Sequence, residues 1–228
     1  MLKTFQSLLH GNFSFLKESR LLVAVSGGLD SMVLVDLCLK LDLNIYLAHC
    51  NFNLRGNESN ENEDLVKTYA KTHSIKLFTT RFDTNGYANS TKQSTQMAAR
   101  QLRYDWFESL KEQQRFDFVL TAHHADDNLE TFLINLSRGT GLEGLTGIPV
   151  INGSIVRPLL QFTRHEILDF ATTENLKWHE DSSNKKIAYV DIINYFDDKS
   201  TISKNDFTIT DTVPSVPVTS GSTRSPTK

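Results

Sequence analysis

The sequence predicts an α/β protein in which helices cover both faces of a parallel β-sheet, the doubly wound arrangement. Two observations support this. From residue 20 to about residue 174, short apolar runs typical of buried strands alternate with segments whose apolar residues recur at helical spacing. Polar or glycine-containing clusters follow several of these runs, where a strand would end. Alternation of this kind is typical of parallel sheets, because each strand is connected to the next through a helix.

The first strand and the first helix are the clearest elements. Residues 21–25 are continuously apolar, as expected for a strand that is buried on both faces. Residues 32–41 carry apolar side chains at helical spacing, which predicts a helix. The later elements are expected, in order, as strand 44–49, helix 58–73, strand 76–81, helix 95–111, strand 118–121 and helix 127–136.

Three polar clusters, at 26–31, 49–55 and 121–130, coincide with the ends of predicted strands. In open parallel sheets, ligands bind beyond the carboxyl ends of the strands. The carboxyl ends of parallel strands all lie at one edge. We therefore expect the three clusters to form a single site.

Composition limits the class of protein. The chain has 228 residues, with 24 basic and 27 acidic side chains, so its formal net charge of −3 gives no general attraction for nucleic acid. Cys38 and Cys50 are too few and too poorly spaced for a disulfide framework or a zinc site, so we expect both to pack. The first residues contain no long apolar signal core, and no run is long enough to span a membrane. We expect a cytoplasmic protein without a membrane partner.

The segment 26–31, Ser-Gly-Gly-Leu-Asp-Ser, is the most informative motif because it joins the first strand to the first helix. Its glycines allow a sharp turn and a close approach to an anion, and the free N–H groups of a helix start favour phosphate. No lysine follows the glycines, so this is not the loop of the common nucleotide hydrolases. A glycine turn that only connects two elements is the alternative. The candidate phosphate-binding residues are Ser26, Gly27, Gly28, Leu29, Asp30 and Ser31.

The segment 121–131 carries two histidines and three acids at another strand end. Asp127 and Glu130 are three residues apart, so a helix places both carboxylates on one face. Asp126 falls at the helix start, where we expect it to cap the helix. Together with His123 and His124, these acids suit the binding of a magnesium nucleotide and proton transfer. A transition-metal site is an alternative, although the His-Glu-x-x-His spacing is missing.

These two motifs, in this order, resemble the tRNA(Ile)-lysidine synthetase family of N-type ATP pyrophosphatases. Further segments agree with that family in sequence and order, namely 49–56, 98–104, 136–145, 157–160 and 178–184. The resemblance covers roughly residues 20–184. It implies a Rossmann-like ATP-pyrophosphatase fold and a catalytic domain over residues 1–184.

The resemblance also implies a reaction. ATP would adenylate the C2 carbonyl oxygen of the wobble cytidine in an isoleucine tRNA with a CAU anticodon, releasing pyrophosphate. The amine of free L-lysine would then displace AMP and form lysidine. ATP and Mg²⁺ are the implied cofactors, and Asp30 with Asp127 would place the metal. The tRNA and L-lysine are the implied partners, and a homodimer is a further expectation.

The resemblance assigns the site residues to three groups. The catalytic group is Asp30, Arg100, His123, His124, Asp127 and Glu130; ATP would be bound by residues 26–31 with His49 and Asn51; the tRNA or substrate would contact Arg55, Arg103 and Arg138. The arginines at 100 and 103 would neutralise phosphate charge, and the two α-helical acids at 127 and 130 would hold the lysine ammonium groups. One of the adjacent histidines would accept the amine proton, and the division between them stays open. Solvated arginines and a packed His49 are the alternatives.

The chain departs from the family pattern after residue 184. The family continues with an Arg-Asn-x-Ile/Leu-Arg element, whereas this chain reads Lys-Lys-Ile-Ala-Tyr-Val-Asp-Ile over 185–192. We therefore expect a divergent connecting segment at 185–207, a disordered Ser/Thr/Pro-rich tail at 208–228 and weak tRNA binding. A truncated, non-catalytic ATP-binding remnant is the alternative function. Thiolation of tRNA is less favoured, because the chain lacks a Cys-x-x-Cys pair.

Overall fold

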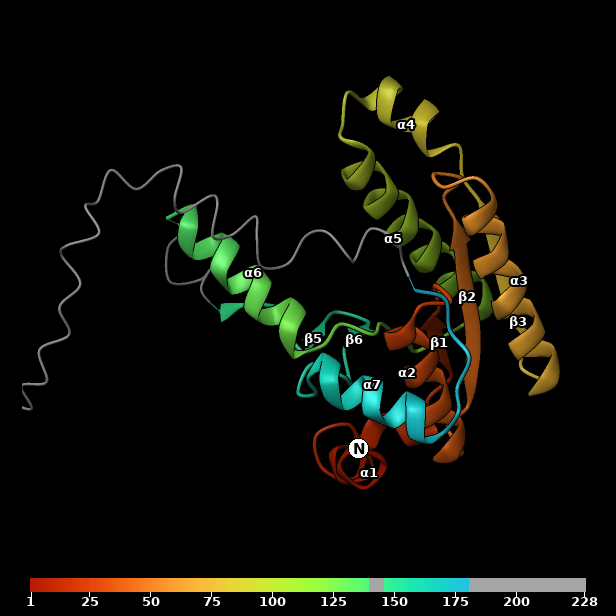
Figure 1. Ribbon diagram of the computed structural model, residues 1–228, viewed down its shortest axis with the longest axis vertical. Coiled ribbons are helices and arrows are strands. Elements are labelled where there is room, and N and C mark those ends of the chain that lie inside the picture. The colour runs from red at the N-terminus through yellow and green to blue at the C-terminus, as the bar shows by residue number, and fades with distance from the viewer. Residues whose placement is uncertain (140–145, 181–228) are drawn as a thin grey trace, which may run out of the picture. The chain divides into compact units, whose positions relative to one another are not determined.

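The six-stranded sheet confirms the predicted α/β class. The computed structural model describes residues 1–139 and 146–180 (Figure 1). Its helical elements are α1 Leu2–His10, η1 Ser14–Glu18, α2 Leu29–Lys40, α3 Asn57–Thr72, α4 Thr84–Thr91, α5 Thr95–Gln114, α6 Ala125–Ser137 and α7 Arg164–Thr173. Its strands are β1 Leu21–Ala24, β2 Ile45–Asn51, β3 Leu77–Arg81, β4 Phe118–Leu120, β5 Ile151–Asn152 and β6 Ile155–Val156. The predicted segment 185–207 and tail 208–228 lie outside the described residues, as does the stretch 140–145.

The strand order is β3-β2-β1-β4-β6-β5, and every neighbouring pair is parallel except the short β5–β6 hairpin. In the register, Leu22 of β1 pairs with Tyr46 on one side and with Val119 on the other. Strands β2 and β3 lie on one side of β1, and the later strands β4, β5 and β6 lie on its other side. A crevice for ligands is expected at such a reversal, between the carboxyl ends of β1 and β4.

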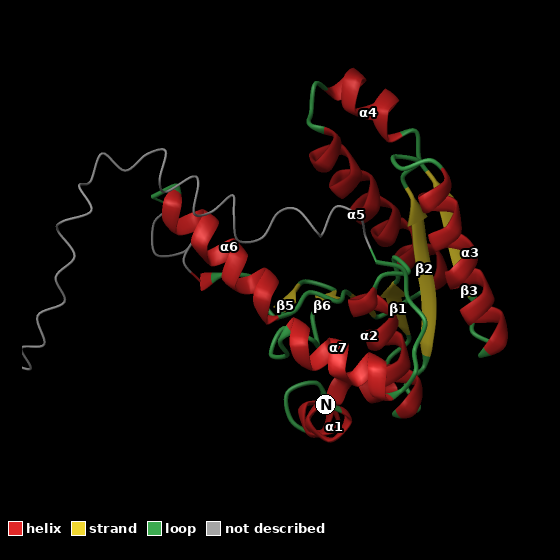
Figure 2. Ribbon diagram, viewed as in Figure 1, coloured by secondary structure: helices red, strands yellow, loops and turns green. Residues whose placement is uncertain are grey.

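Successive residues of β1 point to opposite faces of the sheet, and helices cover both (Figure 2). Leu21 and Val23 belong to the larger hydrophobic cluster, which also contains buried residues of α1, α2, α3 and α7. Leu22 belongs to a second cluster that includes Phe107 and Leu110 of α5. The helices on both faces are therefore confirmed, and β1 is shielded from water on each side.

Helix α2 is buried over most of its circumference, because it lies between the sheet and α7. Its N-cap is Gly28, so the helix begins at Leu29, earlier than the periodicity alone predicts. At its other end, Lys40 pairs with Asp36 at 2.9 Å and with Glu174, just after α7, at 3.0 Å. This packing fixes the position of the turn that precedes α2.

Some elements were not predicted. The sequence patterns of α1, α4 and the β5–β6 hairpin are short, and none of these elements was expected. Strand β2 extends two residues further than predicted, to Asn51, because its final residues pair with β3 up to Asn51–Arg81. Within the described parts of the chain, no helix is both long enough and apolar enough to cross a membrane.

Candidate functional site

The turn at residues 25–28 connects β1 to α2 and places Gly27 and Gly28 between the two elements, as predicted. Gly27 has φ +90°, and a Cβ atom there would lie 3.2 Å from the backbone oxygen of Asn62. A larger residue would be both strained and crowded. The Ser31 hydroxyl accepts a hydrogen bond from the Ser26 N–H at 3.1 Å and donates to the Gly28 oxygen at 2.9 Å. The turn at residues 25–28, called the glycine loop below, is thus closed by hydrogen bonds at the amino end of α2.

Ser26 lines each of three cavities, so the loop is bordered by open space on several sides. Cavity A, about 290 Å³, also includes Asp30, Tyr104, His123 and Asp127 in its lining. Cavity B, about 220 Å³, is lined by Asp30, Asn62, Arg164, Leu168, Trp178, His179 and Glu180 among others. Cavity C, about 530 Å³, is lined by His49, Asn51, Arg55, Arg100 and Arg103 among others. The predicted grouping of three strand-end clusters is therefore present in the structure.

His124, and not Asp126, is the N-cap of α6. The His124 Nδ1 accepts a hydrogen bond from the Asp127 N–H at 3.4 Å, and an Asp127 carboxylate oxygen accepts one from the His124 N–H at 2.8 Å. The expectation that Asp126 caps this helix is wrong. Its carboxylate accepts instead from the Arg164 N–H at 2.8 Å and so joins the amino ends of α6 and α7. The sequence could not show this, because the partner lies 38 residues away.

Asp30 lies between polar side chains from two other elements. Its Oδ2 is 3.0 Å from Nη1 of Arg164, and its Oδ1 is 3.8 Å from Nε2 of His124. That same imidazole nitrogen lies 3.6 Å from Oδ2 of Asp127. Burial raises the pKa of Asp30, while His124 and Arg164 oppose that effect. Among the described residues, none hydrogen-bonds to Asp30 Oδ1, which leaves this oxygen available for a ligand.

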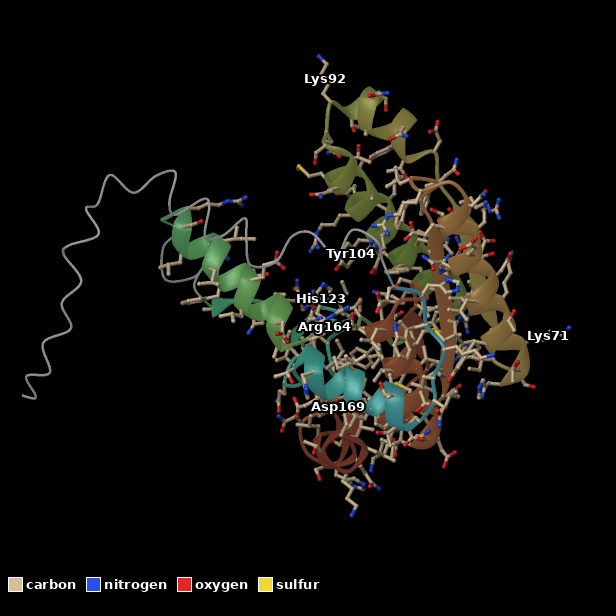
Figure 3. All side chains as sticks on the ribbon, in the orientation of Figure 1. Lys71, Lys92, Tyr104, His123, Arg164 and Asp169 are labelled. Atoms are coloured by element: carbon tan, nitrogen blue, oxygen red, sulfur yellow. The ribbon has the colours of Figure 1, made fainter. Side chains whose placement is uncertain are left out.

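His123 lines Cavity A together with Tyr104, and both are labelled in Figure 3. Its Nδ1 lies 3.0 Å from the Thr121 hydroxyl oxygen. Burial lowers the pKa of His123 to about 4, although nearby Asp127 acts in the opposite direction. The ring is therefore neutral near pH 7 and has a nitrogen that can accept a proton.

His49 and Asn51 of β2 line Cavity C, and both are buried. The Nδ1–H of His49 donates to the Val25 oxygen at 2.9 Å, since a carbonyl can only accept, and this assigns the tautomer. Burial lowers the pKa of His49, so the neutral ring retains a lone pair on Nε2. Asn51 donates through its side chain to Glu63 at 2.7 Å and accepts from the Asn53 N–H at 3.0 Å.

Three of the predicted arginines converge on Cavity C, whereas Arg138 does not. Arg103, which also lines Cavity A, lies 5.2 Å from the ring centre of Phe52, and Arg100 lies 4.9 Å from that of Tyr104. These cation–π contacts hold the guanidinium groups beside the cavity. In the described lining of the three cavities, Arg138 and Glu130 are absent, because both lie further along α6.

Glu63, which was not among the predicted site residues, fixes the wall of Cavity C. Its carboxylate accepts from Asn51 at 2.7 Å and from Arg81 at 3.0 Å, and it pairs with Lys67 at 2.7 Å. Burial acts to raise the pKa of Glu63, but hydrogen bonds from Lys67, Asn51 and Arg81 outweigh it and lower the pKa to about 2. The only local signal was Lys67, four residues along the same helix. Arg164 carried no signal in the sequence, whereas His179 falls in the segment 178–184 that resembles the family, without a role assigned to it.

No cluster of three or more His, Cys, Asp and Glu side chains that could hold a metal occurs among the described residues. Cys50 lines Cavities A and C, and Cys38 is buried. Burial raises the pKa of each thiol to about 12, with Arg103 slightly opposing this at Cys50. Both sulfur atoms are therefore protonated near pH 7 and are poor nucleophiles.

Comparison with known proteins places the chain in a family. The PP-loop domain family matches residues 1–193. Curated relatives named tRNA(Ile)-lysidine synthase include one from Bacteroides thetaiotaomicron, 45% identical over 77% of this chain and 41% of the relative. Another, from Porphyromonas gingivalis, is 45% identical over 72% of this chain and 36% of the relative. The chain thus spans well under half the length of these relatives.

The fold also resembles a solved structure. A U34-tRNA thiolase from Methanococcus maripaludis, with its 4Fe–4S cluster, superposes with a TM-score of 0.68 at 16% identity, over 86% of this chain and 72% of that one. At this identity the likeness concerns the fold alone. The family match extends over β1, the turn at 25–28 and the start of α6, all of which contribute residues to Cavity A. The chain belongs to the PP-loop domain family.

Proposed function

We propose that this chain carries out the ATP-dependent formation of lysidine in an isoleucine tRNA with a CAU anticodon. The cytidine C2 carbonyl oxygen attacks the α-phosphorus of ATP, a C–O–P linkage forms and pyrophosphate leaves. The amine of L-lysine then attacks C2, the C–O bond to AMP breaks, and the amine loses a proton. The enzyme is a ligase on this proposal, and it acts in the cytoplasm.

The observation that carries the proposal is the lining of Cavity A. Ser26 of the turn at 25–28 and Asp30 of the first turn of α2 line it, together with His123 of the β4–α6 connection and Asp127 of the first turn of α6. A phosphate-binding loop and a proton acceptor therefore adjoin the same space of about 290 Å³. Such a site can couple phosphate activation to attack by an amine. The names of the relatives, tRNA(Ile)-lysidine synthase, support this choice of substrates.

The loop would hold the β- and γ-phosphates of ATP through backbone N–H groups at the amino end of α2. The residues present fit a magnesium nucleotide, because Asp30 keeps a buried oxygen without a hydrogen-bond partner in the described structure. Asp30 and Asp127 would supply carboxylate oxygens to a magnesium ion that arrives with the phosphates, since magnesium is usually held by one or two carboxylates together with substrate phosphates and waters. When bound, the metal supplies positive charge that neutralises the phosphates. Arg100 and Arg103 would add to this neutralisation from α5.

We assign the proton acceptor to His123. The Nδ1 lone pair of His124 is used by the cap of α6, and its Nε2 faces the carboxylates of Asp30 and Asp127. Accepting a proton at Nδ1 would therefore disrupt the start of the helix. His123 has no such structural role at the helix start and lines Cavity A directly.

Two sets of carboxylates could bind the lysine ammonium groups. The first is Asp127 with Glu130 on α6, of which only Asp127 lines a described cavity. The second is Asp30 with Glu180 in Cavity B, where Arg164 would suit the lysine carboxylate. Glu130→Gln and Glu180→Gln separate the two sets, since only the variant that removes a lysine ligand should raise the KM for lysine. Each serves as the matched control for the other.

The tRNA would approach Cavity C, where Arg55, Arg100 and Arg103 offer positive charge to its backbone. His49 and Asn51 would contribute to the ATP side of the same cavity. Association into a homodimer is part of the proposal, to be tested by sedimentation of the purified chain. Thiolation is disfavoured by the two protonated, unpaired thiols.

The test is transfer of labelled lysine to isoleucine tRNA by the isolated chain at moderate salt, with pyrophosphate release measured in parallel. We expect pyrophosphate release that depends on both lysine and tRNA. An isoleucine tRNA whose wobble base is uridine is the matched control and should accept no lysine. ATP binding without lysine transfer would instead establish the non-catalytic remnant and overturn the proposal.

A further inference from the structure

The segment at residues 178–180 lies against the glycine loop on the side of Cavity B. The backbone N–H of His179 donates to the Gly27 oxygen at 3.0 Å. The Nδ1 of the same histidine is 2.8 Å from the Oδ1 of Asn62 on α3, which is 117 residues away in sequence. Both residues line Cavity B with Ser26 and Gly28. This contact unites three segments that are far apart in the chain.

The hydrogen bond to Gly27 determines which way the next N–H points. In a planar trans peptide, the C=O and the following N–H point in opposite directions. Since His179 takes the Gly27 oxygen, the Gly28 N–H is directed away from His179, and it donates to the Ser26 hydroxyl oxygen at 3.2 Å. Gly28 lines Cavity B, and the Ser26 hydroxyl that accepts from its N–H borders all three cavities. On the proposed function, a phosphate at the loop would accept from this N–H in place of the Ser26 oxygen.

Asn62 supports the loop from the other side. A Cβ atom on Gly27 would lie 3.2 Å from the Asn62 oxygen and 3.4 Å from its Cβ. Gly27 thus packs directly on the residue whose side chain holds the ring of His179. Because Gly27 has no side chain, the Gly27–Gly28 peptide could adopt more than one orientation, and the glycine alone does not determine which one it takes. The Ser26 hydroxyl holds the N–H of this peptide, and His179, which contacts Asn62, holds its oxygen from outside the loop.

We propose that His179 is a positioning residue for phosphate binding: its backbone fixes the Gly27–Gly28 peptide, and Asn62 fixes its imidazole. The inference rests on the proposed function, in that the loop is taken to bind the phosphates of ATP. His179 acts on the phosphate-binding N–H and touches neither the base nor the ribose on this proposal. Its loss therefore weakens binding of the phosphate part of the nucleotide and leaves the AMP part unaffected.

The experiment compares ligands that differ in the part of ATP they represent. Calorimetry with magnesium would measure the affinities of ATP, pyrophosphate and AMP for the wild-type chain and for His179→Ala. We expect ATP and pyrophosphate to bind about 10-fold more weakly to the variant, as for the loss of one or two hydrogen bonds, and AMP to bind unchanged. His179→Asn should restore most of the affinity, because its amide nitrogen takes the place of Nδ1. His165→Ala, an exposed histidine on α7, is the matched control and should match wild type.

Three results would overturn the inference. Unchanged pyrophosphate affinity in His179→Ala is the first, and an equal loss for AMP, which indicates general misfolding, is the second. The third is a double variant of His179→Ala and Asn62→Ala that binds pyrophosphate more weakly than either single variant, because two residues that act as a unit should not have additive effects. A wild-type chain that binds neither ATP nor pyrophosphate would overturn the proposed function itself, which distinguishes the two failures.

Discussion

The glycine loop and helix α6 carry candidate residues of the same site, yet the structure supports them very differently. The loop is held by Ser31 from within and by Asn62 and His179 from other elements. The first turn of α6 is similarly fixed by its capping box. Beyond that turn, α6 has no buried residue within its described length, and Leu129 and Leu136 are half exposed.

The difference separates two kinds of candidate residue. Residues that would contact the nucleotide are fixed by backbone geometry and by partners from distant segments, as a preorganised phosphate site requires. Glu130 lies instead on the part of α6 beyond its first turn and is half-buried, while Arg138 follows the last residue of the helix and is exposed in the described structure. We therefore expect substitutions near the loop to affect chemistry and stability strongly, and substitutions far along α6 to affect binding modestly.

The largest effect is expected for Asp30→Asn, which keeps the shape of the side chain and removes its charge. Pyrophosphate release should fall about 100-fold, as for loss of one preorganised electrostatic group, and Mg-ATP should bind more weakly. The rate of pyrophosphate release is measured in a time-course assay, and the affinity for Mg-ATP by calorimetry. Asp64→Asn, on the exposed surface of α3, is the matched control. Unchanged Mg-ATP affinity and turnover in Asp30→Asn would show that this carboxylate does not serve the nucleotide.

The difference between the glycine loop and the far end of α6 is tested directly by Gly27→Ala and Gly139→Ala. Both glycines have positive φ, +90° and +64°, but a Cβ atom meets Asn62 at 3.2 Å in the first and, among the described residues, nothing within 4 Å in the second. We expect a loss of about 3 kcal/mol in unfolding free energy for Gly27→Ala and about 1 kcal/mol for Gly139→Ala. Urea unfolding measures both. Equal losses would mean that the close approach of α3 to the loop contributes nothing.

Local sequence was enough to predict the parts of the fold that depend on local pattern. The loop at 26–31 and the alternation of strands with helices could be predicted because each depends on neighbouring residues. The β5–β6 hairpin could not, since its strands have two residues each and depend on distant pairing: β6 pairs with β4, as at Val119–Ile155, and β5 pairs with β6. Helix α4 was missed because its eight residues show little amphipathic pattern.

The site was predictable to the extent that strand ends determine it. Ligands bind at the carboxyl ends of parallel strands, and this rule is sufficient to group the glycine loop with His123 from the sequence alone. The partners of these groups were not predictable. Arg164 reaches Asp30 across 134 residues, and His179 reaches Asn62 across 117. Such pairs result from packing and leave no periodic signal in the sequence.

An intermediate effect is expected for Glu63→Gln, which removes the charge that holds Asn51, Arg81 and Lys67. The folded-state pKa of Glu63, about 2, lies below its ordinary value of 4.5, so the carboxylate stabilises the fold above pH 4.5. That contribution is lost as the pH falls from 4.5 towards 2. We expect Glu63→Gln to cost about 2 kcal/mol at pH 7, because three donors lose a charged acceptor.

Urea unfolding of wild type and Glu63→Gln across a pH series measures this effect. The difference in unfolding free energy should be constant from neutral pH down to about 5 and should narrow below 4.5, where the unfolded chain begins to bind a proton. Glu58→Gln, near the start of the same helix, is the matched control and should show a smaller cost. A difference that stays constant down to the lowest pH at which the protein folds would contradict the depressed pKa.

The smallest effect is expected for Arg138→Gln, at the exposed end of α6. If Arg138 meets a phosphate of the tRNA, its loss should weaken tRNA binding about threefold and reduce the slope of log affinity against log salt by about one. Mg-ATP affinity should not change, because Arg138 lies outside the described lining of the cavities around the loop. Arg103→Gln is the matched contrast: it lines Cavities A and C and should weaken ATP and tRNA together. Filter binding over a salt series measures the tRNA affinity and its dependence on salt. A loss of ATP affinity in Arg138→Gln would show that α6 is coupled to the nucleotide site along its whole length, and the contrast between the two regions would fail.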